Sequence, residues 1–73
     1  MAKACILVKT TPTATDRILE AIVKMVSVRK AYAAYGRWDI VAFIDAPVEQ
    51  IGKISAKINQ MDNVRSTETL PEA

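Results

Sequence analysis

Histidine is absent from this 73-residue sequence, and cysteine occurs only once, as Cys5. Zinc sites are built from histidine nitrogen and cysteine sulfur, and an internal disulfide needs two cysteines. We therefore expect no metal, no other cofactor and no disulfide within the chain. Cys5 lies in the apolar run Ala4–Val8, which favours a small buried thiol over a reactive one.

Long apolar runs are also missing. No stretch approaches the ~20 apolar residues that span a bilayer, and the apolar part of the opening segment MAKACILVK is too short for a signal peptide. We expect a cytoplasmic protein with no membrane partner.

Neither sign of charge predominates. Ten basic and eight acidic residues give a net charge of +2, and Arg29 and Lys30 are the only adjacent basic pair. Binding to nucleic acid phosphates needs lysine and arginine clustered on one face. The scattered charges indicate a solvated surface, with no direct binding of nucleic acid.

The small size of the chain has a consequence for stability. A domain of this length buries only about 60% of its unfolded surface and is marginally stable alone. Since neither a disulfide nor a metal is available, partner subunits are the remaining means of stabilisation.

Hydrophobic periodicity predicts six elements. Strands are expected at Ala4–Val8, Val28–Tyr35, Asp39–Ile44 and Val64–Leu70, and helices at Asp16–Val26 and from Pro47 to the turn at Met61–Asn63.

Both helices have an apolar stripe at helical spacing. In the first helix the stripe consists of Ile18, Ile22, Met25 and Val26, and in the second of Ile51, Ile54, Ile58 and Met61. Thr13 and Asp16 have the spacing of a capping box. Gly52 lies within the second helix, which suggests close packing at that position.

The order strand, helix, strand, strand, helix, strand predicts an α+β ferredoxin-like fold, βαββαβ. The first and third strands are apolar on both faces, so they belong in the centre of an antiparallel four-stranded sheet of order 4-1-3-2. Two helices cover one face of this sheet. The other face presents either Cys5 with Leu7, or Ala4 with Ile6 and Val8, and we expect it to pack on a second copy.

A polar elbow, Gly36–Asp39, joins the second and third strands. In one interpretation it is only a turn, with Asp39 bonded to the loop backbone and Trp38 covering an edge of the core. In the other it holds a small zwitterion, because backbone amides suit a carboxylate, Asp39 suits an ammonium and Trp38 offers an apolar wall. Spacing alone does not choose between them.

The sequence resembles the effector-binding (RAM) domain of the Lrp/AsnC transcription regulators over its whole length. AYAAYGRWDIVAFI is similar to the family's strand, Gly-x-x-Asp loop and apolar strand, and VRSTETL resembles its closing Val-x-x-Thr-x-Thr strand. The opening ILVKT is similar too. The order and spacing of these motifs make the resemblance more specific than any one of them.

The resemblance implies a domain that dimerises through its sheets, assembles further to an octamer, and binds amino acids or related effectors between dimers. The implied effector-binding residues are Gly36 and Asp39, with Arg37 and Trp38 lining the same loop. Thr67 and Thr69 match the Thr-x-Thr pair, although alternating threonines also suit a half-exposed edge strand.

Full-length members of this family carry an N-terminal helix-turn-helix domain, whereas the first predicted strand here begins close to Met1. We expect residues 1–73 to form a single stand-alone domain that does not bind DNA itself. It would act in transcription regulation by assembling with itself or with full-length regulators.

Three other functions remain open. A small dimeric α+β barrel enzyme, of the monooxygenase or isomerase type, would have Asp39, Glu68 and the tyrosines as its acid and base candidates. We expect no enzyme, because no nucleophile and base form a pair. RNA binding on the open sheet would need aromatic residues on the central strands, which offer only Phe43. The last alternative is an oligomer with no ligand.

Overall fold

The computed structural model describes residues 1–72. Its elements are β1 (Ala2–Thr10), a 3₁₀ turn (Pro12–Ala14), α1 (Thr15–Val23), β2 (Val28–Ala33), β3 (Ile40–Ala46), α2 (Val48–Asn59) and β4 (Val64–Pro71). The predicted order of strands and helices is confirmed. Among residues 1–72, no helix is both long enough and apolar enough to cross a membrane.

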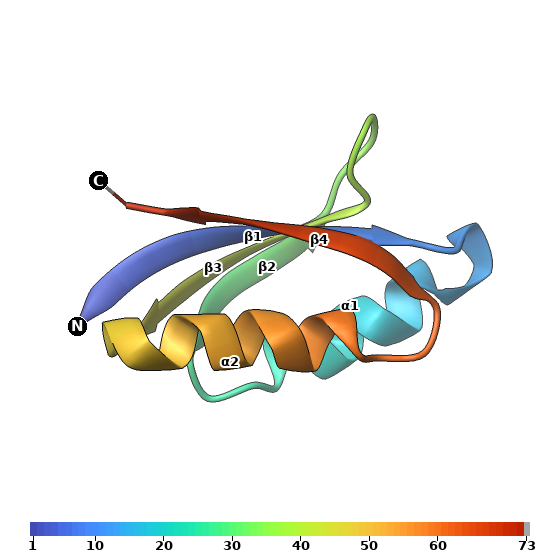
Figure 1. Cartoon of the computed structure of the whole chain (residues 1–73). Coiled ribbons are helices and arrows are strands. Elements are labelled where there is room, and N and C mark those ends of the chain that lie inside the picture. Colours follow the sequence, from blue (N-terminus) through green and yellow to red (C-terminus); the bar gives the residue numbers. More distant parts are fainter. Residues whose placement is uncertain (73) are drawn as a thin grey trace.

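The four strands form one antiparallel sheet in the order β2-β3-β1-β4. This is the predicted order 4-1-3-2, so the ferredoxin-like fold is confirmed. Both helices lie against one face of the sheet, and no element within residues 1–72 covers the opposite face (Figure 1). β1 and β3, the strands with the most continuous apolar sequence, lie in the centre of the sheet, with a neighbouring strand on each side.

Alternation along β1 decides which residues meet the helices. Ala4, Ile6 and Val8 are buried, so the intervening Cys5 and Leu7 lie on the uncovered face. β3 follows the same alternation and buries Ile40, Ala42 and Ile44. The helices complete the core with a small set of side chains: Ile18, Ile22, Ile51 and Ile58.

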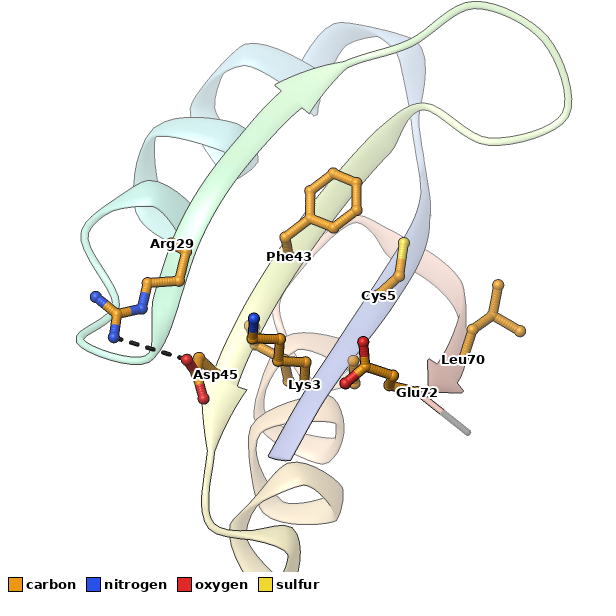
Figure 2. Close-up of a pocket in the computed structure, with 9 residues that line it drawn as sticks. Lys3, Cys5, Arg29, Phe43, Asp45, Leu70 and Glu72 are labelled. Carbon is orange, nitrogen blue, oxygen red and sulfur yellow. Dashed lines mark ion pairs between the residues drawn. The ribbon is translucent and has the colours of Figure 1, made fainter. Parts of the chain in front are cut away.

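The uncovered face, called the open face below, is apolar in its centre. Its apolar centre consists of Cys5, Leu7, Tyr32, Val41, Phe43 and Leu70. Phe43 is 40% exposed and Leu70 47% exposed, and the rings of Tyr32 and Phe43 lie with their centroids 6.2 Å apart. A shallow cavity of about 380 Å³ crosses this face beside Phe43, Cys5 and Leu70 (Figure 2).

A row of charges borders the apolar centre of the open face. Lys3 pairs in register with Asp45, and the Arg29 guanidinium lies 3.7 Å from an Asp45 carboxylate oxygen (Figure 2). Glu72 follows on the β4 side. The charges of Arg29, Asp45, Lys3 and Glu72 therefore alternate in sign across the sheet. The other carboxylate oxygen of Asp45, Oδ1, is buried and has no hydrogen-bond partner among the described residues.

Three details of the helices differ from the prediction. α1 ends at Val23, and Val26 is fully exposed because the chain already turns toward β2 at Met25, whose N–H donates to Ile22 O. Thr13 belongs to the 3₁₀ turn and makes no capping bond, so the capping box is wrong. Apart from the backbone of its own helix and its chain neighbours, no atom lies within 4 Å of where a Cβ at Gly52 would be, so the predicted close packing there is wrong.

Candidate functional site

The segment 34–39 forms a loop that projects from the sheet on the side opposite the helices (Figure 1). β2 ends at Ala33 rather than at the predicted Tyr35, and the Ala34 N–H donates to Asp39 O across the base of the loop at 2.9 Å. Gly36 has φ +125°, a conformation that other residues rarely adopt. The predicted positive φ of this glycine is confirmed.

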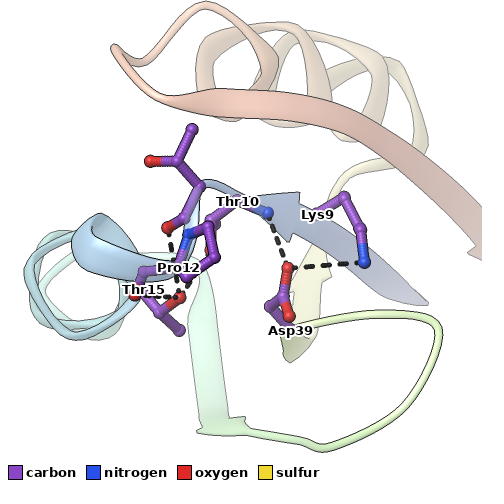
Figure 3. A network of polar contacts seen from close by, with 6 residues as sticks. Lys9, Thr10, Pro12, Thr15 and Asp39 are labelled. Carbon is purple, nitrogen blue, oxygen red and sulfur yellow. Dashed lines mark hydrogen bonds and ion pairs between the residues drawn. The ribbon is translucent and has the colours of Figure 1, made fainter.

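Asp39 fastens the loop to the end of β1. Its carboxylate Oδ2 accepts a hydrogen bond of 2.9 Å from the Thr10 backbone N–H (Figure 3). The backbone N–H of Asp39 donates to Val8 O at 2.9 Å. Lys9 Nζ lies 4.0 Å from the same carboxylate oxygen. Asp39 thus bonds to backbone, as the turn interpretation expected, but to the backbone of β1 instead of its own loop.

A second polar contact joins the end of β1 to the start of α1. Thr10 is only 2% exposed, and its hydroxyl lies 2.7 Å from that of Thr15 at the start of α1 (Figure 3). This contact pairs a polar group that would otherwise be buried alone. The loop base, the end of β1 and the start of α1 are therefore one hydrogen-bonded unit.

Two hollows flank the loop. One, of about 300 Å³, lies toward α1 and includes Asp16, Tyr35 and Asp39 in its lining. The other, of about 550 Å³ and called the basic hollow below, is lined by Lys9, Arg37, Trp38, Arg65 and Ser66.

The basic hollow brings together positive charges that are far apart in the sequence. Lys9 comes from β1, Arg37 from the loop and Arg65 from β4. Ser66 lies opposite Lys9 in the β1–β4 register, so β4 runs directly beside β1 at this place. These basic residues are scattered along the sequence, and the strand order makes them neighbours at this edge of the sheet.

Thr67 and Thr69 lie apart from the loop residues. The Thr69 hydroxyl is 2.6 Å from that of Ser55, and the Thr67 hydroxyl donates to Asn59 Oδ1 at 3.5 Å. Both threonines therefore face α2, whereas Gly36, Arg37, Trp38 and Asp39 lie together in the loop. Sequence alternation alone could not indicate which face of β4 the threonines would take. Their role in binding an effector stays a prediction.

Cys5 lies in the centre of the open face rather than in the core beneath the helices. It is half-buried, and burial raises the pKa of its thiol because desolvation disfavours the thiolate. The thiol therefore contributes to the apolar floor beside Phe43 and Leu70.

The fold and the loop define a ferredoxin-like domain with one open sheet face and a loop closed by an acid. Solved structures share this architecture over the whole chain. TTHA0845 from Thermus thermophilus is 27% identical with a TM-score of 0.94, over 100% of this chain and 94% of that one. FFRP-DM1 is 25% identical with a TM-score of 0.92, over 100% of both chains.

AsnC from E. coli has the same fold, with a TM-score of 0.86 and 20% identity. The match covers 97% of this chain and 50% of AsnC, so this chain spans about half of that regulator. These neighbours confirm the predicted resemblance to the Lrp/AsnC effector-binding domain. No protein-family model and no curated protein matches the sequence.

Proposed function

We propose that this chain is a non-catalytic effector-binding and oligomerisation module of transcription regulation. It dimerises through the open face, assembles further through its loops, and binds an amino acid or related small molecule beside Gly36–Asp39. It acts by assembling with itself or with full-length Lrp/AsnC regulators and does not bind DNA itself. The likeness to AsnC and the similar length of TTHA0845 and FFRP-DM1 support this proposal.

The observation that carries the proposal is the open face. One side of the sheet is covered by both helices, whereas the other exposes Tyr32, Phe43 and Leu70 at 40–47%. A contiguous apolar patch of this kind marks an interaction surface. A second copy is the fitting partner, because a small domain gains from a second apolar layer the stability that its own core lacks.

The charges around the patch favour a second copy over an unrelated apolar partner. Arg29 and Lys3 alternate with Asp45 and Glu72 across the sheet, so the face carries both signs. Under two-fold symmetry such a surface is self-complementary. A cation from the partner would also satisfy Asp45 Oδ1, which is buried and without a partner within residues 1–72.

The loop is suited to an effector site because it is both exposed and held in place. Asp39 fixes the base of the loop through Thr10, while Tyr35 is fully exposed and Arg37 is exposed. A ligand held between such loops of neighbouring dimers would link the dimers. Effector binding would then change the assembly without rearranging the core.

The test is light scattering after size exclusion, with and without each of the twenty amino acids, followed by thermal unfolding on those that change the mass. We expect a dimer or a multiple of it, and we expect one amino acid to shift the distribution and raise the melting temperature. Phe43→Glu should give a monomer, because it places a charge in the centre of the open face.

Val26→Glu is the matched control. It introduces the same negative charge at a fully exposed apolar residue between α1 and β2, away from the open face. It should leave the mass unchanged. A wild-type monomer that is indifferent to all twenty amino acids would overturn the proposal, as would a dimer that withstands Phe43→Glu.

A further inference from the structure

We propose that the effector is a small anion with two negative charges, bound in the basic hollow by Lys9, Arg37 and Arg65 against the ring of Trp38. This inference rests on the proposed function and names the ligand class of that site. The evidence is the set of residues that line the hollow, the exposure and ion pairing of its charged side chains, and its volume.

The lining has one sign of charge. Three of its five residues are cations, the fourth is Trp38 and the fifth is Ser66, and no acidic residue within positions 1–72 contributes to it. Asp39 lines the hollow on the other side of the loop instead. The three cations attract a carboxylate or a phosphate, whereas the ammonium of an amino acid would have to lie toward the Asp39 carboxylate, 4.0 Å from Lys9 Nζ.

The cations of the hollow are available to a ligand. Arg37 and Arg65 are exposed and form no ion pair within residues 1–72, whose pairs involve other arginines and lysines. Lys9 approaches Asp39 only to 4.0 Å, at the edge of ion-pair range, and its side chain is 40% exposed. The Asp39 carboxylate also accepts a hydrogen bond from the Thr10 N–H, so it has a partner besides Lys9.

The three cations account for more than the net charge of the chain. They carry three positive charges, whereas the whole chain carries +2. The rest of the molecule is therefore slightly acidic. The three neighbouring cations of the hollow would attract a small anion.

The chemistry of the side chains sets the ligand class. A guanidinium presents a planar fork of N–H donors that matches a carboxylate or a phosphate with two parallel hydrogen bonds. Two arginines and a lysine can neutralise two negative charges, the Ser66 hydroxyl adds a donor, and Trp38 supplies a flat apolar wall. The volume of about 550 Å³ lies within the range of small-molecule pockets.

Two sources share this chemistry, a dicarboxylic amino acid and a small phosphate compound. The experiment titrates the full chain with L-aspartate, L-glutamate, succinate and inorganic phosphate, by calorimetry and by Trp38 fluorescence. L-Asparagine and L-glutamine are matched controls, because each differs from its acid by one amide. We expect each preferred acid to bind about ten-fold more tightly than its amide, with affinity falling as salt rises.

Variants separate the hollow from surface charge in general. Arg37→Gln and Arg65→Gln should each weaken binding by about ten-fold, because each removes a charge-assisted contact. Lys53→Gln removes an exposed cation from α2, on the helical side of the sheet, and should leave the affinity unchanged. Circular dichroism checks that the variants keep the fold.

The outcomes are distinct. Binding of the two amino acids but not of phosphate assigns a dicarboxylic amino acid, and equal binding of succinate and phosphate assigns a simple dianion; either supports the inference. Binding of a neutral amino acid that is insensitive to Arg37→Gln and Arg65→Gln would overturn the inference but leave the proposed function standing. If no amino acid and no anion bound, both the inference and the proposed effector binding would be overturned.

Discussion

At the scale of single residues, Asp39 shows how one side chain joins two parts of the fold. It lies directly before β3, caps the end of β1 through the Thr10 N–H, and closes the loop through its backbone. The sequence indicates a functional or structural acid at this position, but not its partner, because Thr10 is 29 residues away along the chain. Only the antiparallel pairing of β1 and β3 brings them together.

We expect Asp39→Ala to lower the free energy of unfolding by about 1–2 kcal/mol, since it removes a partly exposed, charge-assisted hydrogen bond and leaves the Thr10 N–H without its partner. Asp39→Asn, which keeps an acceptor oxygen, should lose less. Urea unfolding followed by Trp38 fluorescence measures both.

Asp62→Ala serves as the control for Asp39→Ala, because Asp62 is an exposed acid in the turn before β4 and makes no polar contact within residues 1–72. If Asp39→Ala were no less stable than Asp62→Ala, the bond to Thr10 would contribute nothing to the fold.

At the scale of elements, periodicity predicts which segments form helices and strands, but not where packing ends them. The stripe of α1 continues in the sequence to Val26, yet the helix ends at Val23 because the chain must turn to reach β2. The glycines show the same limit. Gly36 is placed correctly in a turn, whereas Gly52 is not closely packed, since the space around a helix face depends on tertiary contacts.

The two glycines give a matched pair of predictions with opposite signs. Gly52→Ala should raise the free energy of unfolding by about 1 kcal/mol, because alanine favours the helix and no atom outside the adjacent helix backbone and chain neighbours lies within 4 Å of the new Cβ. Gly36→Ala should lower it by about 1–3 kcal/mol, because φ is +125° there.

Chemical denaturation of both alanine variants in the same buffer tests the pair. If both variants changed the free energy of unfolding by the same amount in the same direction, the predicted difference between a helical glycine with free space and a glycine in a strained turn would be wrong.

At the scale of the whole molecule, the order of elements and their apolar patterns suffice to predict the sheet order and the uncovered face. The sequence leaves open which alternate residues of β1 lie on the uncovered face. In the structure they are Cys5 and Leu7. The basic hollow is beyond prediction from sequence. Lys9, Arg37 and Arg65 become neighbours only when β4 pairs with β1 and the loop folds over the same edge.

Cys5 provides a direct measure of whether the open face is covered in solution. Because burial raises the pKa of its thiol, less thiolate is present at neutral pH than for a free cysteine, and labelling by a thiol reagent should be slow and should accelerate as pH rises into the alkaline range. In a sheet-to-sheet dimer the thiol is covered as well. Labelling should then be slowest at high protein concentration and should accelerate on dilution as the dimer dissociates.

The two surface variants make this measurement specific to the open face. Phe43→Glu should label at one rate at all concentrations, because it stays monomeric, whereas Val26→Glu should show the concentration dependence of the wild type. If light scattering reported a dimer while the labelling rate of Cys5 did not change on dilution, the dimer would be formed by another surface. The apolar centre of the sheet would then still need a partner, because neither helix of the described chain reaches it.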